Sequence, residues 1–102
     1  MSNVTNLILS FDIRENEEAR IAEVNAYSFR RGVGFRDLTE CGGGTKYFEI
    51  PVWGGAFNYL DLDDLLAHLR TVDWESPGLV RLFVCEQWDD SFRLVTFGTP
   101  PA

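Results

Sequence analysis

The chain has 102 residues, the size of a single domain that can bury a core without disulfides or a metal. Hydrophobic residues make up 45% and aromatic residues 14%, a composition that excludes an intrinsically disordered chain. The formal net charge is −7, which argues against binding to nucleic-acid phosphates or to an anionic membrane surface. This charge favours a basic protein as partner, although it can also serve solubility alone.

The cysteine content and the apolar segments of the sequence bear on the cellular location of the protein. Cys41 and Cys85 are too few for a disulfide framework, although a bond between these two stays open. Residues 1–6 lack the basic and apolar regions of a secretory signal, and no apolar run is long enough to span a bilayer. We therefore expect a cytoplasmic protein with reduced thiols.

The first elements along the chain are a strand and a helix. Apolar residues alternate over residues 7–13, which predicts a strand whose buried face carries Leu7, Leu9, Phe11 and Ile13. Asn16 is a good N-cap for a helix over residues 17–27. A stripe at helical spacing predicts the packing face, with Ile21 and Val24 flanking it: Ala19, Ala22, Ala26 and Phe29.

A glycine-rich region follows. Arg30, Arg31, Gly32 and Gly34 end the helical pattern, and residues 35–39 predict a short strand. Residues 41–45 contain three consecutive glycines and predict a flexible loop. Alternation over residues 46–53 predicts a third strand, with a bend at Gly54 and Gly55 before a further short strand over residues 56–60.

The second half contains the strongest helical signal. Asp61 is the expected N-cap, with Asp64 as the acid of a capping box. The helix that follows carries an apolar stripe of Leu62, Leu65, Leu66, Leu69 and Val72. Residues 76–78 end it, and two strands follow as a hairpin over residues 79–86 and 92–97, with a turn at residues 88–91. The first of these strands is apolar on both faces, which predicts a central position. Residues 98–102 are expected to form a tail.

The expected order is β-α-β-β-α-β-β. This predicts an α+β fold with two helices packed on a mainly antiparallel sheet of about five strands, ferredoxin-like or related. Pro51 argues against that arrangement because the third strand would be central, where proline cannot donate to the ladder. A sheet with the third strand at an edge is the alternative.

No catalytic, cofactor-binding or metal-binding residues are predicted. His68 is expected to pair with Asp64 or to bond along its helix, and Asp61, Asp63 and Asp64 are expected to cap that helix. Residues 42–46 lack the residue order of a phosphate-binding loop. Cys85 is expected to be buried and inert, and Cys41 exposed but poorly reactive beside Glu40.

The aromatic residues suggest a binding surface. Trp53 and Tyr47 share the less apolar side of the predicted third strand, close to Tyr59. Trp88 lies in a turn with Glu86, Asp89 and Asp90. Tryptophan and tyrosine often anchor interfaces, although the same rings can simply complete a small core. The residues we predict to bind a partner are Trp88, Asp89, Asp90, Glu86, Trp53 and Tyr59.

These observations lead to a function hypothesis with an alternative. The first is a non-catalytic acidic module that binds another protein, as an inhibitor, an immunity- or antitoxin-like protein, or an adaptor. The alternative is a small-molecule-binding domain, alone or as a homodimer, with a pocket between sheet and helices near residues 53–59. An enzyme ranks third because no nucleophile–base pair is visible.

Overall fold

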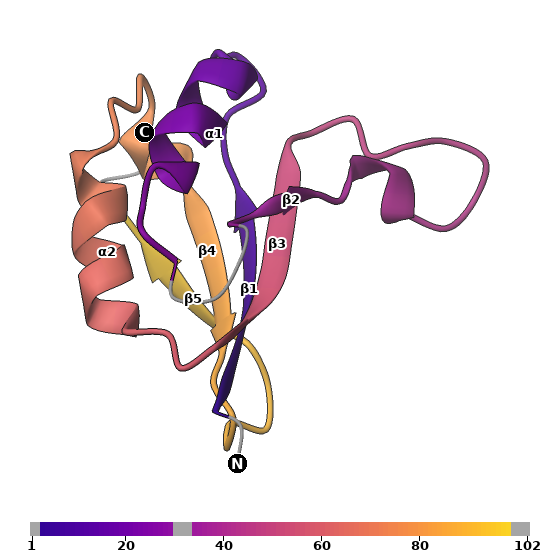
Figure 1. Cartoon of the computed structure of the whole chain (residues 1–102). Coiled ribbons are helices and arrows are strands. Elements are labelled where there is room, and N and C mark those ends of the chain that lie inside the picture. Colours follow the sequence, from indigo (N-terminus) through magenta and orange to yellow (C-terminus); the bar gives the residue numbers. More distant parts are fainter. Residues whose placement is uncertain (1–2, 30–33, 99–102) are drawn as a thin grey trace.

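The computed structural model describes residues 3–29 and 34–98, so the predicted break at 30–33 and the tail at 99–102 lie outside the described residues. Two helices pack on a five-stranded antiparallel sheet, as the sequence predicts (Figure 1). The elements in chain order are β1 (Val4–Ser10), α1 (Glu17–Asn25), β2 (Arg36–Asp37), β3 (Val52–Asn58), α2 (Leu62–Thr71), β4 (Arg81–Cys85) and β5 (Arg93–Thr96).

The strand order is β2-β3-β1-β4-β5, and every neighbouring pair is antiparallel. The first four strands have an order compatible with a ferredoxin-like sheet, and β5 extends it beside β4. The alternative with the third strand at an edge is wrong, because β3 lies between β2 and β1. Pro51 is accommodated because β3 begins one residue after it, so the sheet needs no hydrogen bond from its nitrogen.

Strand β1 forms the centre of the sheet, and its burial alternates as the sequence predicts. Leu7 and Leu9 face the helices and are fully buried, whereas Ile8 on the opposite face is partly exposed. The strand ends at Ser10 rather than at residue 13. A turn closed by the bond from the Glu15 amide to the Asp12 carbonyl leaves Ile13 64% exposed, so Ile13 is not part of the core.

Helix α1 begins as predicted but packs through a different face. The side chain of Asn16 accepts a hydrogen bond from the Ala19 amide, which confirms the N-cap. Ile21 and Val24 are the buried residues of the helix, whereas Ala22 and Ala26 are exposed. The alanine stripe was therefore wrongly predicted to be the packing face, because turning the larger side chains inward buries more apolar area.

The third strand lies further along the chain than predicted. Residues 46–50 form loop, and a single strand runs from Val52 through Gly54 and Gly55 to Asn58 without the predicted bend. Gly54 is needed there because a Cβ atom would lie 2.7 Å from the Leu7 carbonyl oxygen and 2.8 Å from Leu38 Cδ1. Residues 46–50 pair with none of the strands in the described part of the chain, so their alternating pattern does not produce a strand.

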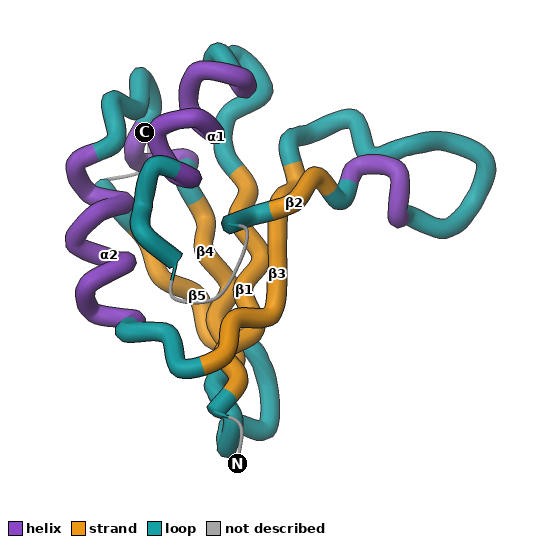
Figure 2. Tube along the Cα trace, viewed as in Figure 1, coloured by secondary structure: helices purple, strands orange, loops and turns teal. Residues whose placement is uncertain are grey.

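Residues 39–51, which we call the arm, project from the edge of the sheet formed by β2 and β3 (Figures 1 and 2). A short 3-10 turn at Thr39–Cys41 begins the arm, and the Phe48 amide donates to the Thr39 carbonyl across its base. Tyr47, Phe48 and Ile50 are all exposed. The predicted glycine loop is therefore the outer part of a larger projection.

Helix α2 is integral to the core. The Asp61 side chain accepts from the Asp64 amide, which confirms the N-cap. Leu65 and Leu69 are fully buried, and Val72 is nearly so, whereas Leu62 and Leu66 are only partly buried at the margin. The Trp74 indole closes this end of the core: its ring lies 5.2 Å from that of Phe11, and its Nε1 donates to the Leu69 carbonyl.

A buried carboxylate joins the two halves of the chain. Glu15 accepts hydrogen bonds from the Arg20 guanidinium at 3.0 Å and from the backbone amides of Glu75 and Ser76 at 3.1 and 2.9 Å. Its side chain has no exposed surface. Because every partner is a donor to the ionised form, this carboxylate fixes the start of α1 against the segment that leads into β4.

Candidate functional site

The turn between β4 and β5 presents Trp88, whose side chain is 86% exposed. A residue predicted to bind a partner has to be accessible, and Trp88 is. Leaving an indole in water forgoes the burial of a large apolar area. Trp88 is therefore the large apolar residue on this surface that is most available to a partner.

Ion pairs fix the conformation of this turn. Arg93 bridges the two acids on either side of the tryptophan, with Nη2 3.0 Å from Glu86 Oε2 and Nη1 2.9 Å from Asp89 Oδ2. Asp89 Oδ2 also accepts from the Glu86 amide, and the Asp89 amide donates to the Glu86 carbonyl. Glu86 and Asp89 thus hold the turn, and their negative charge is partly offset by the guanidinium.

Asp90 is the acid of this turn that keeps its full charge for a partner. It is exposed, and within the described part of the chain it forms no ion pair. The turn is also attached to the centre of the sheet, because the Gln87 side chain accepts from the Val4 amide at 2.8 Å. The group formed by Glu86, Trp88, Asp89 and Asp90, which we call the tryptophan turn, is therefore acidic and well ordered by its own contacts.

Trp53 does not join the tryptophan turn. It pairs with Leu9 and with Asp37, at the opposite end of the sheet from the pairing of Val4 with Asn58. Its ring is half-buried, and its indole nitrogen donates to Glu17 Oε2 over 2.8 Å. Much of Trp53 is therefore committed to holding β3 against α1.

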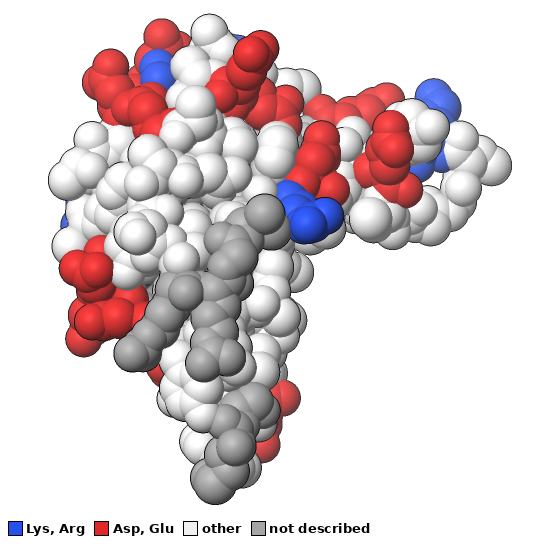
Figure 3. Space-filling model, viewed as in Figure 1, with Lys and Arg blue, Asp and Glu red and all other residues white. Residues whose placement is uncertain are grey.

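A shallow groove of about 430 Å³ lies beside Trp53. It is lined by Glu17, Glu18, Ile21, Asp37 and Trp53. The sequence prediction did not connect these carboxylates to Trp53, because they lie on other elements. Figure 3 shows the acidic side chains gathered over α1, at the start of α2 and along the arm. The acidic and aromatic residues thus lie in two separate groups rather than on one surface. One group is the tryptophan turn, and the other is the groove beside Trp53.

Tyr59 lies at the same end of the sheet as the tryptophan turn. Its backbone is in the left-handed region with φ of 57°, and its amide donates to the Asn3 carbonyl at 2.8 Å. Its side chain is 38% exposed. A left-handed conformation is uncommon for tyrosine and costs free energy. Here it redirects the chain from β3 into the connection to α2.

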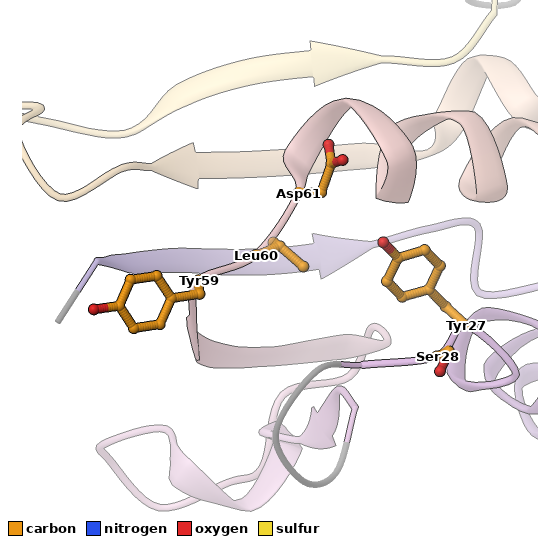
Figure 4. Close-up of a pocket in the computed structure, with 5 residues that line it drawn as sticks. All are labelled: Tyr27, Ser28, Tyr59, Leu60 and Asp61. Atoms are coloured by element: carbon orange, nitrogen blue, oxygen red, sulfur yellow. The ribbon is translucent and has the colours of Figure 1, made fainter.

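A second hollow, of about 390 Å³, lies between the end of α1 and the connection from β3 to α2. Figure 4 shows its lining residues, with the Tyr59 ring pointing away from Tyr27. The Tyr27 hydroxyl donates to Asp64 at 2.8 Å. Burial and the neighbouring Asp64 raise the pKa of Tyr27 to about 12, so the hydroxyl stays protonated and acts as a donor.

The last candidate residues from the sequence are the histidine, the possible metal ligands and the two cysteines. His68 does not pair with Asp64: its Nε2 lies 2.8 Å from the Glu23 carbonyl oxygen, so it connects α2 to α1. In the described residues no three side chains of His, Cys, Asp or Glu are close enough to hold a metal ion. Both thiols are free, and Cys85 is only partly buried, which corrects the expectation of a buried side chain.

Neither α1 nor α2 is long and apolar enough to be a membrane-crossing helix. Comparison with protein-family models, with curated proteins and with solved structures gives no match.

Proposed function

We propose that this chain is a non-catalytic module that binds a basic protein through the tryptophan turn, with Trp88 as the anchor. The observation that carries the proposal is the 86% exposure of Trp88 on a turn held by ion pairs. Tryptophan is enriched among the residues that dominate interface energetics. An inhibitor, an immunity- or antitoxin-like protein and an adaptor all require such a surface.

The ordering of the turn supports the proposal. Binding normally costs free energy because loops and side chains lose freedom at the interface. The contacts of Arg93 with Glu86 and Asp89 meet part of that cost before a partner arrives. A partner therefore has to immobilise little more than the indole.

The charge of the turn supports a basic partner. The turn carries three carboxylates, of which two contact its one guanidinium, in a chain whose net charge is −7. Such a field raises the rate of encounter with a positively charged surface and loses its effect as salt is added. The proposed partner is accordingly a protein with a basic face and an apolar recess that fits an indole.

The test uses the chain immobilised on a support and an extract of its source cells, followed by mass spectrometry of the captured proteins. Trp88→Ala should lose the partner, and measured affinity should fall by about 2 kcal/mol or more. Ile13→Ala is the matched control, because Ile13 is an exposed apolar residue outside the turn. Equal capture by both variants and by the unchanged chain would refute the role of Trp88.

The contribution of charge is tested with Asp90→Asn. Asp90 is preferable to Asp89, whose carboxylate accepts from the Glu86 amide and whose loss would disturb the turn. The substitution should mainly slow association and reduce its salt dependence. An unchanged association rate at low salt would show that the acids do not attract the partner.

A small-molecule-binding domain is the second candidate, favoured by the hollow beside Tyr27 and Tyr59. Its volume of about 390 Å³ is within the range of ligand pockets. Its known polar groups are already engaged, since Tyr27 donates to Asp64 and Asp61 caps α2. A ligand that raises the melting temperature of the unchanged chain but not of Tyr27→Phe would favour this function.

A further inference from the structure

One face of the sheet is covered by neither α1 nor α2, the two α-helices of the described residues. The alternation that directs Leu7, Leu9, Leu82 and Val84 into the core directs their neighbours to the other side. The central row of that side pairs Ile8 with Gly54 and Phe83, and Phe83 with Leu94. We call this side the open face.

The open face exposes large apolar side chains. Phe83 is 37% and Leu94 51% exposed, and both lie in the central row. Phe92, which immediately precedes β5, is 46% exposed. Val52 and Ala56 continue the surface across β3. A contiguous apolar patch of this kind on a small domain indicates an interaction site.

Within the described strands, the open face carries none of the chain's 16 acidic residues. The strand residues that point to this side include no Asp or Glu, and they include two arginines, Arg36 and Arg81. The acid of β2, Asp37, points to the opposite side with Trp53.

We propose that the open face binds the open face of a second copy of this chain. Two molecules with a net charge of −7 repel one another, and the repulsion is weakest where neither presents carboxylates to the other. A strongly basic partner would gain nothing from this face and would be drawn to the acidic surfaces instead. The open face borders the tryptophan turn, because the Cys85 thiol lies 3.7 Å from the Asp89 carbonyl oxygen, but the proposed contact is made by strand residues and does not depend on the proposed function.

The area of the open face sets the affinity that we expect for the dimer. Four strands at a spacing of about 4.8 Å and a length of about 20 Å give a projected area of roughly 300 Å². A standard stable interface buries about 800 Å² on each partner. We therefore expect a weak, concentration-dependent dimer in which two sheets stack about 10 Å apart.

The first test is analytical ultracentrifugation of the full chain from about 5 to about 500 µM, a range that brackets weak association. The average mass should rise toward that of a dimer. Leu94→Glu should remain monomeric throughout, because it places a carboxylate on the exposed apolar part of the stacked faces, beside Phe83. Ile13→Glu is the matched control, because Ile13 is an exposed apolar residue away from the face, and it should associate like the unchanged chain.

The second test locates the interface through a thiol. Cys85 pairs with Asn6 and so lies on the open face, whereas Cys41 lies in the arm. In a Cys41→Ser variant, alkylation of Cys85 should slow at least twofold as the chain concentration rises through the mass transition. In a Cys85→Ser variant, alkylation of Cys41 should not change.

Three results would overturn the proposal. The first is a monomer at every concentration. The second is a dimer that Leu94→Glu leaves intact or that Ile13→Glu abolishes equally. The third is an alkylation rate of Cys85 that stays constant while the mass doubles. Added salt distinguishes this interface from a charge-driven contact, because screening should preserve or strengthen the dimer.

Discussion

The indole nitrogen of Trp53 donates a hydrogen bond to the Glu17 carboxylate over 2.8 Å, joining the first residue of α1 to β3 across 36 positions of sequence. A hydrogen bond to a charged acceptor contributes about 1.5–3 kcal/mol. We expect Trp53→Phe to lose free energy of unfolding in that range, measured by urea denaturation. Glu17→Gln keeps an acceptor oxygen and should lose less; a larger loss than for Trp53→Phe would contradict the assignment.

The contribution of α2 to the core is tested with two leucines one turn apart. Leu69 is fully buried and Leu66 only partly so. Leu69→Ala should cost about 2–5 kcal/mol, because it removes buried methyl groups and leaves a cavity. Leu66→Ala should cost clearly less. Urea unfolding that ranks the two in the reverse order would mean that the helix packs through a different face.

The buried carboxylate of Glu15 provides a test of the network that joins α1 to residues 75 and 76. Glu15→Gln removes a charge from a group with three donors, and we expect a loss of about 3 kcal/mol. Glu18→Gln is the control, since Glu18 is exposed on the same helix. Thermal or urea unfolding of both variants measures the difference. Equal losses would show that the network contributes little.

Asp12 should make the free energy of unfolding depend on pH under acidic conditions. Hydrogen bonds from the Arg14 side chain and backbone lower the pKa of Asp12 from 3.8 to about 2. Because the folded state holds the proton less tightly than the unfolded state, this contribution is complete above about pH 4. It is lost as the pH falls toward 2. Asp12→Asn should therefore differ from the unchanged chain by a constant amount above pH 5, and the difference should shrink below about pH 4.

Trp88 should be visible spectroscopically as a solvated indole. Trp74 is buried and Trp53 half-buried, so iodide or acrylamide should quench mainly Trp88. Trp88→Phe should remove the quenchable, red-shifted part of the emission and change stability by less than about 0.5 kcal/mol. A blue-shifted component lost in this variant, or a loss of several kcal/mol, would place Trp88 against the sheet.

Local patterns were informative wherever one chain segment decides its own conformation. The N-caps at Asn16 and Asp61 need only a side-chain oxygen three residues before an amide, and both are confirmed. The alternation of Leu7 and Leu9 and the spacing of Leu65 and Leu69 similarly identify core residues, because they follow the periods of strand and helix. The element order was enough to predict the α+β class.

The errors occurred where two segments compete for the same neighbours. The alternation of residues 46–50 resembles a strand, yet β1 pairs with residues 52–58, where Gly54 allows the two backbones to approach closely. Helix α1 has two apolar stripes, and the one with Ile21 and Val24, rather than the one with the alanines, is buried. Such choices depend on what lies opposite, which spacing along one segment does not reveal.

The same contrast between local patterns and tertiary contacts applies to the residues predicted to bind a partner. The sequence by itself determined that Trp88 lies among acids at a hairpin turn, because a turn places adjacent residues together. Only the tertiary structure decided that Trp53 lies at the other end of the sheet, that Arg93 pairs with Glu86 and Asp89, and that Phe83 and Leu94 share an open face. Strand order and register set these proximities, and both result from the packing of the whole sheet rather than from any local pattern.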